Sequence, residues 1–279
     1  MNFGGNEVAN DYRNSRIAIL PVPYDETSTW MKGADKGPDA IMEASVNLEF
    51  YDIETNSEVY KHGICTLEPL LKKSSPNELV DSVREKVLFL LSEKKFPVIV
   101  GGNHTVSIGS VGAFGEVTND LCVLQLDAHS DLRNEYEGSQ FNHACTMARI
   151  KEIAPVVQVG IRSVSAEELT NIDTERIFLA HKLYYDKSLY VRAIDLLSKN
   201  VYITIDLDVF DPSLIPSTGT PEPGGPEYFE IIHFLHDVVK RKNVVGFDVV
   251  ELCPSPVNKS SDFIAAKIIY QLLSYIFAK

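Results

Sequence analysis

Four short segments place histidines or carboxylates directly after apolar, β-branched runs. They lie at 101–104 (Gly-Gly-Asn-His), 127–131 (Asp-Ala-His-Ser-Asp), 206–212 (Asp-Leu-Asp-Val-Phe-Asp-Pro) and 249–252 (Val-Val-Glu-Leu). Such apolar runs are typical of buried parallel strands, and open α/β sheets bind ligands at the carboxyl ends of their strands. Because ionisable groups are costly to bury without a counter-charge, Asp and His gathered at these ends predict a bound cation.

The spacing inside these segments favours a metal site over isolated caps. Acidic and histidine residues alternate within 127–131, and Asp206 and Asp208 alternate in the same way. On extended strands each set would project to one face. A lone Asp at a strand end is usually a helix cap or turn residue, but two such sets and a glycine-preceded histidine form a specific pattern. The candidate metal ligands are His104, Asp127, His129, Asp131, Asp206 and Asp208.

This ligand set is mostly oxygen, with two imidazoles and no thiolate. Hard carboxylates with a minority of imidazole suit Mn²⁺, and suit Mg²⁺ or Zn²⁺ less well. Four carboxylates can balance two divalent cations, and paired metals about 3.5–4 Å apart acidify a bridging water towards hydroxide. The set therefore predicts a hydrolase that holds two Mn²⁺ ions per chain.

Composition narrows the class of partner. The 279 residues carry a formal net charge of −13, with a pI near 5.0, which argues against nucleic acid and anionic membranes and mildly favours a cationic small molecule. No apolar stretch approaches a bilayer span, and residues 1–15 lack the layout of a signal peptide. The four cysteines show no Cys-x-x-Cys pairing, so neither a zinc site nor a disulfide framework is indicated. We expect a cytoplasmic protein.

Strand and helix patterns alternate along most of the chain. Strands are predicted at 16–23, 96–102, 121–127, 156–161, 176–180, 201–205 and 244–250. Helices are predicted at 39–49, 77–94, 106–114, 166–171, 189–198, 226–242 and 262–277. The alternation predicts one α/β domain over residues 1–279 with a mainly parallel sheet and right-handed crossovers. About eight strands could also close into a (β/α)₈ barrel, and periodicity alone leaves both architectures open.

The motifs resemble those of the arginase–agmatinase (ureohydrolase) family, which carries Gly-Gly-Asp-His, Asp-Ala-His-x-Asp and Asp-x-Asp-x-x-Asp-Pro. Residues 217–225, Ser-Thr-Gly-Thr-Pro-Glu-Pro-Gly-Gly, match a further family segment, and the similarity extends from Gly33 to Glu251. The resemblance implies a three-layer α/β/α fold with a parallel eight-stranded sheet. It also implies two Mn²⁺ ions, a trimer or hexamer, and hydrolysis of a guanidino compound to urea.

Carried over position by position, the resemblance also assigns roles. Asp127 and Asp206 would bridge the two ions, and His143 falls where the family has a catalytic histidine. Glu251 falls where the family has a glutamate that holds the substrate guanidinium. One ion would be held by His104, Asp127, Asp131 and Asp206, and the other by His129, Asp127, Asp206 and Asp208.

Two residues depart from the family pattern. Asn103 replaces the family's aspartate, and Thr105 replaces the commoner serine. Asn103 is not a ligand in this mapping, so metal binding should survive. The change removes a negative charge beside the site and could alter how His104 is oriented.

The segment between Asp131 and His143 is the expected specificity element. In it Glu135 and Glu137 outweigh Arg133, so a carboxylate-bearing tail would meet net negative charge. This favours agmatine, hydrolysed to urea and putrescine, over arginine or a guanidino acid such as guanidinobutyrate. Two functions outside this reaction stay open. One is a dinuclear metallophosphoesterase, which would normally offer Arg or Lys near the phosphate, and the second is a non-catalytic homologue.

Overall fold

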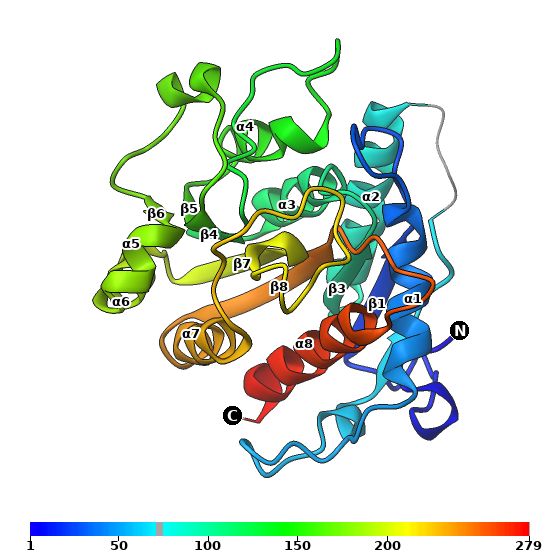
Figure 1. Ribbon diagram of the computed structural model, residues 1–279. Coiled ribbons are helices and arrows are strands. Elements are labelled where there is room, and N and C mark those ends of the chain that lie inside the picture. Colours follow the sequence, from blue (N-terminus) through cyan, green and yellow to red (C-terminus); the bar gives the residue numbers. More distant parts are fainter. Residues whose placement is uncertain (71–74, 279) are drawn as a thin grey trace.

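Eight parallel strands form the centre of the computed structural model, which describes residues 1–70 and 75–278 (Figure 1). Their order is β2-β1-β3-β8-β7-β4-β5-β6. The two edge strands, β2 and β6, do not pair with each other, so the sheet is open and not a barrel. The strands are β1 (Ile17–Val22), β2 (Ile64–Thr66), β3 (Phe96–Gly101), β4 (Leu121–Leu126), β5 (Val156–Ile161), β6 (Ile177–Leu179), β7 (Asn200–Asp206) and β8 (Asn243–Val250).

Helices cover both faces of this sheet, which gives the three predicted layers (Figure 1). One face carries α2 (Pro76–Ser92), α3 (Val106–Val117) and α4 (Thr146–Ile150). The other face carries α1 (Gly37–Ser45), α5 (Ala180–Tyr185), α6 (Ser188–Leu196), α7 (Tyr228–Arg241) and α8 (Ser260–Phe277). The predicted three-layer α/β/α fold is therefore confirmed.

Successive side chains of a strand pack in two separate hydrophobic clusters, one on each face of the sheet. Ile19 of β1 packs in a cluster with helices α1, α7 and α8, whereas its neighbour Leu20 packs in a second cluster with α2 and α3. The same division separates Val98 from Ile99 on β3 and Ile203 from Tyr202 on β7. Successive side chains of a strand point to opposite faces, so strands buried on both faces are apolar throughout.

Most predicted elements lie within a few residues of the observed ones. Helix α2 begins where the sequence signals it, because Ser75 accepts a hydrogen bond from the Glu78 backbone N–H and Pro76 occupies the first turn. The helix predicted at 166–171 is instead a 3₁₀ helix, η5 (Ala166–Thr170). The sequence did not indicate β2, α4 or α5, which have only three, five and six residues and so show too little periodicity.

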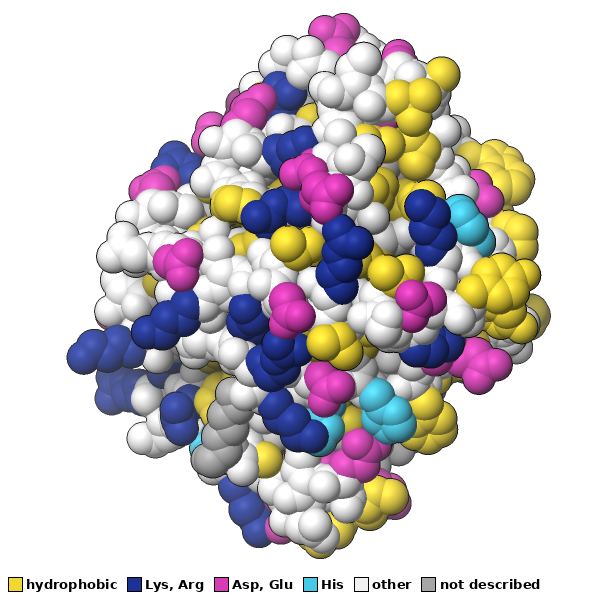
Figure 2. Space-filling view, turned by 90° about the vertical axis from the view of Figure 1, so that its left-hand side faces the viewer, with side chains coloured by type: hydrophobic (Ala, Val, Ile, Leu, Met, Phe, Trp, Pro, Cys, Tyr) yellow, Lys and Arg dark blue, Asp and Glu magenta, His cyan; other side chains and the backbone are white. Residues whose placement is uncertain are grey.

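Charges of both signs are intermingled on the face over α5 and α6 (Figure 2). Three ion pairs join elements there, namely Lys187 with Glu230, Arg192 with Glu175, and Arg241 with Asp195. Exposed pairs of this kind contribute about 0–1 kcal/mol each to stability. No helix among residues 1–70 and 75–278 is long and apolar enough to cross a membrane.

Candidate metal centre

Four adjacent strands, β3, β8, β7 and β4, deliver the candidate site at their carboxyl ends. Asp127 directly follows β4, Asp206 is the last residue of β7, and Glu251 directly follows β8. His104 follows β3 after a turn that requires glycine, because a Cβ at Gly102 would lie 1.9 Å from the Tyr24 carbonyl oxygen. Topology thus gathers residues far apart in sequence at one edge of the sheet.

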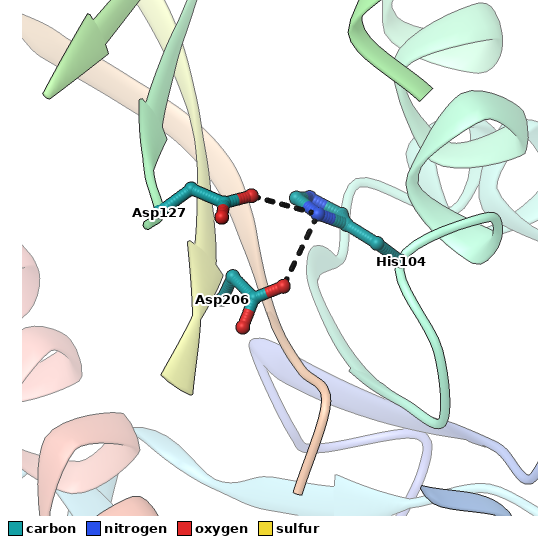
Figure 3. Close-up of side chains that lie close together, drawn as sticks. All are labelled: His104, Asp127 and Asp206. Atoms are coloured by element: carbon teal, nitrogen blue, oxygen red, sulfur yellow. Dashed lines mark ion pairs between the residues drawn. The ribbon is translucent and has the colours of Figure 1, made fainter. Parts of the chain in front are cut away.

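His104 lies among three carboxylates, of which Figure 3 shows Asp127 and Asp206, and Asp131 is the third. Its Nδ1 is 3.1 Å from Asp127 Oδ2, 3.1 Å from Asp131 Oδ2 and 3.4 Å from Asp206 Oδ2. All four residues are buried, yet Nδ1 makes no well-formed hydrogen bond. A buried nitrogen lone pair that faces converging carboxylates fits a cation between them.

The other nitrogen of His104 is held by a hydrogen-bonded chain. Nε2 lies 2.9 Å from Thr204 Oγ1, which donates to Asp248 Oδ1 at 2.5 Å. The Tyr202 hydroxyl donates to the second Asp248 oxygen at 2.8 Å. Because the Thr204 hydroxyl donates to Asp248, it accepts from Nε2–H, and Nδ1 is the nitrogen that would bind a cation. Orientation of a ligating imidazole by its other nitrogen is usual in metal sites.

A second group joins Asp127, His129 and Asp208. His129 Nδ1 lies 2.8 Å from Asp208 Oδ2 and 3.7 Å from Asp127 Oδ1. Gln125 steadies Asp127 by donating to its Oδ2 at 2.7 Å. Asp127 belongs to both possible metal groups, whereas Asp206 belongs only to the first. The bridging role of Asp206, like the ligand role of all six residues, stays a prediction.

The mutual charges of the cluster are the strongest sign that a cation belongs there. Burial and the neighbouring Asp127 carboxylate raise the pKa of Asp131 to about 7. Burial and the charges of Asp208 and Asp127 raise the pKa of Asp206 well above its usual value. Burial opposes protonation of His129, but the Asp208 and Asp127 carboxylates still raise its pKa to about 12. Carboxylates packed this closely cannot all ionise without compensating charge, so the donor set fits hard divalent cations.

The route by which these residues converge differs from the predicted one. Strand β4 ends at Leu126, and Asp131 adopts a left-handed backbone with φ of +53°. Asp208 lies in a 3₁₀ helix, η6 (Leu207–Val209). The expectation that alternation on extended strands aligns the ligands is therefore wrong. Loops bend the side chains together, and the Asp206 side chain accepts a bond from the Asp208 backbone N–H at 2.9 Å.

A cleft opens over the carboxylate cluster, and its lining includes His104 and Asp206. His143 also lines this cleft, at the start of 3₁₀ helix η4 (His143–Cys145). Burial lowers its pKa to about 4, and the positive charge of His129 acts in the same direction. Its Nδ1 has no hydrogen-bond partner in the described structure. A neutral imidazole with a free nitrogen, placed beside the carboxylate cluster, suits proton transfer.

Glu251 faces the cleft from the end of β8. Its Oε1 accepts the His104 backbone N–H at 2.6 Å. Burial raises its pKa to about 8, aided by the Asp208 and Asp131 carboxylates. Among the described residues, no Lys or Arg forms an ion pair with Glu251. A planar cation bound there would remove the cost of ionising this carboxyl group.

The rim of the cleft differs from the predicted specificity element. The lining includes Arg133 and Tyr136 but neither Glu135 nor Glu137, which are exposed. The predicted specificity segment therefore reaches the cleft through Arg133 and Tyr136, and any effect of its two glutamates on a carboxylate-bearing tail would act from outside the cleft. Tyr136 turns inward in a tight turn closed by its backbone bonds to Ser139, so the residues on either side of it point outward.

Asn103 contacts the rim and not the metal cluster. Its Nδ2 donates to Thr27 Oγ1 at 2.6 Å, and its Oδ1 accepts the Thr105 backbone N–H at 3.2 Å. The Thr27 and Thr105 hydroxyls lie 3.0 Å apart. The His104 ring is oriented by Thr204, and the Asn103 side chain makes its hydrogen bonds elsewhere.

Three supporting residues had a sequence signal that was not recognised. Gln125, Thr204 and Asp248 are polar positions inside otherwise apolar strands. Each lies two or three residues before Asp127, Asp206 or Glu251. A fully buried polar side chain needs a partner, so these positions could have been predicted to support the site. Trp30 and Met31, which also line the cleft, carry no motif.

Comparison with known proteins gives a consistent result. The chain matches the arginase family over residues 15–274. It is 34% identical over 284 residues to an N(1)-aminopropylagmatine ureohydrolase of Synechocystis sp., covering 98% of this chain and 93% of that protein. It is 32% identical to an agmatinase of Pyrococcus horikoshii, covering 94% and 93%. The solved agmatine ureohydrolase of Thermoplasma volcanium superposes with a TM-score of 0.90 at 29% identity, covering 98% and 94%.

Proposed function

Because this chain belongs to the arginase family of hydrolases, which act on guanidino C–N bonds, we propose that it releases urea from a cationic guanidino amine. The candidates are agmatine, which would give putrescine, and agmatine extended by an aminopropyl group, which would give a triamine. The observation that carries the proposal is Glu251, a carboxyl group without a Lys or Arg partner in the described structure, set beside two groups of metal-ligand residues.

Six side chains would hold two divalent cations, with Mn²⁺ favoured by the mixture of carboxylates and imidazoles. When bound, such a pair lowers the pKa of water towards neutrality and so supplies a nucleophile for hydrolysis. Asp127, shared by both groups, would couple the two positions. The six residues are His104, Asp127, His129, Asp131, Asp206 and Asp208.

The remaining chemistry falls to Glu251 and His143. The Glu251 carboxylate would accept two N–H groups of the guanidinium and so turn its carbon towards the carboxylate cluster. His143, uncharged because its pKa is near 4, would take up the proton that the attacking water gives up and pass it to the departing amine nitrogen as the C–N bond breaks. That protonation makes the amine a better leaving group, and urea remains.

A cationic tail suits this cleft better than a carboxylate. Arg133 is the only Lys or Arg among the described residues that line the cleft. Its guanidinium pairs with Glu167 and lies over the Tyr136 ring, 4.6 Å from the ring centroid. A carboxylate or phosphate tail would therefore find no free cation. The same observation disfavours a phosphoesterase.

The test is urea release from agmatine, aminopropylagmatine, arginine and guanidinobutyrate, after chelation and reloading with Mn²⁺, Mg²⁺ or Zn²⁺. We expect the two cationic amines to exceed the two acids in kcat/KM by at least about tenfold, the effect of roughly 1.4 kcal/mol. Asp127→Asn is the matched inactive control. Urea release from none of the four compounds with any metal would overturn the proposal.

A further inference from the structure

Residues 28–31 form one wall of the cleft and carry the only tryptophan of the chain. The Trp30 side chain is 71% exposed and Met31 is 38% exposed. Single exposed apolar residues are common on protein surfaces and need no explanation. Trp30 differs from the similarly exposed Tyr185 because it lines the same cleft as Glu251 and the candidate metal ligands.

This wall is fixed at both ends. At one end the Asn103 amide donates to Thr27. At the other end the Asp25 carboxylate accepts the Gly33 backbone N–H at 2.6 Å, and Lys32 Nζ donates to the Asp25 carbonyl oxygen at 2.7 Å. Contacts at both ends hold the segment that carries Trp30 beside the cleft.

The indole of Trp30 is largely exposed. Among the described residues, no aromatic ring and no Lys or Arg stacks on Trp30. A tryptophan ring is the best aromatic partner for a cation, because its π face carries partial negative charge. The ring is therefore available to a ligand that enters the cleft.

The acidic side chains of the described cleft lining do not offer a free partner to an outer cation. Apart from Glu251 and the candidate metal ligands, Glu168 is the only acidic residue of the described cleft lining. Its carboxylate already accepts hydrogen bonds from Ser130 Oγ, the Leu132 backbone N–H and the Ser165 backbone N–H, at 2.6, 2.8 and 2.7 Å. An ammonium group at the rim therefore meets a π face and not a free acid.

We infer that Trp30 is a specificity-determining residue whose indole binds the outer ammonium group of an extended guanidino polyamine. This inference rests on the proposed function. With the guanidinium at Glu251, agmatine ends at its first amine. The aminopropyl extension adds a second ammonium group three methylenes further towards the rim. Trp30 therefore favours the extended substrate over agmatine.

The kinetic test compares urea release from both substrates in Trp30→Phe and Trp30→Leu. Exposed cation–π contacts raise affinity by about two- to fivefold. Trp30→Leu should therefore lower the kcat/KM for the extended substrate, relative to the kcat/KM for agmatine, by about that factor. Trp30→Phe retains a weaker π face and should lower the ratio less. Tyr185→Leu, which removes an exposed aromatic ring outside the cleft, is the matched control. An unchanged ratio in Trp30→Leu, with urea still released, would overturn the inference.

A binding test is independent of catalysis, because the fluorescence of the single tryptophan reports directly on the indole. Titration with putrescine and with its aminopropyl derivative should change Trp30 emission, with the triamine effective at about two- to fivefold lower concentration. Equal effects, or none, would refute the role of Trp30. Urea release from no guanidino compound, together with selective quenching by the triamine, would instead overturn the proposed function and leave the polyamine contact in place.

Discussion

The floor and the rim of the cleft are built in opposite ways. On the floor, His104, Asp127 and Asp206 are at most 3% exposed, and their positions follow from four adjacent parallel strands. At the rim, Trp30 and Met31 are exposed and lie on a loop that is fixed near its ends.

This difference in burial separates the residues that act in catalysis from those that select the substrate. A buried carboxylate cluster tolerates few arrangements, because each uncompensated charge is costly. A loop on the surface can change without disturbing the core. Changes on the floor should therefore abolish turnover for every substrate, whereas changes at the rim should alter only the preference among substrates.

The largest effect is expected for Asp127→Asn. Asp127 belongs to both candidate metal groups, so its loss should lower the metal content. Urea release should fall by more than roughly 100-fold, which is the upper end of the loss when a residue that only supports a metal ligand is changed. Metal content by elemental analysis and urea release on the same sample measure both. The control is Asp208→Asn, which touches one group. A larger loss in Asp208→Asn than in Asp127→Asn would show that Asp127 is not the shared ligand.

A smaller but still large effect is expected for His143→Ala. The residue lines the cleft but belongs to neither metal group, so metal content should be unchanged while kcat falls by about 10²- to 10⁴-fold. Rapid kinetics at saturating substrate and elemental analysis test the two parts separately. If the metals are lost as well, His143 supports the floor and does not act on the substrate.

Glu251 should give guanidinium binding a characteristic pH dependence. Burial and the neighbouring Asp208 and Asp131 carboxylates raise its pKa to about 8, so below that pH the carboxyl group holds a proton that a guanidinium must displace. Affinity for agmatine should therefore rise as the pH approaches 8 and level off above it. Agmatine binding to the chelated protein, measured by calorimetry from about pH 6 to pH 9, tests this, because bound divalent cations would themselves lower the pKa of Glu251. In Glu251→Gln, agmatine binding should be weaker and this rise with pH should be absent.

The same contrast explains what the sequence could predict. Strands buried on both faces are nearly continuous apolar runs, so the order of strands and helices could be predicted from the sequence. Ligand-type residues at the ends of these runs identified the floor of the cleft. The directions of loop side chains were not visible. Tyr136 points inward because of a turn closed at Ser139, and Asp208 reaches the cluster from a 3₁₀ helix. Neither geometry has a periodic signature, so alternation was the wrong rule there.

The smallest effect is expected at the exposed glutamates of the rim. Glu135 and Glu137 do not line the cleft, and water and salt screen exposed charges beyond about 10 Å. The double change Glu135→Gln with Glu137→Gln should therefore alter the ratio of kcat/KM for agmatine over arginine by less than about twofold, within the range of a weak surface charge. The ratio should be measured at low and physiological salt, with Trp30→Leu beside it on the extended substrate. A pronounced shift towards arginine that vanishes at high salt would mean that these carboxylates steer the substrate from outside the cleft, and selection would then extend beyond the rim.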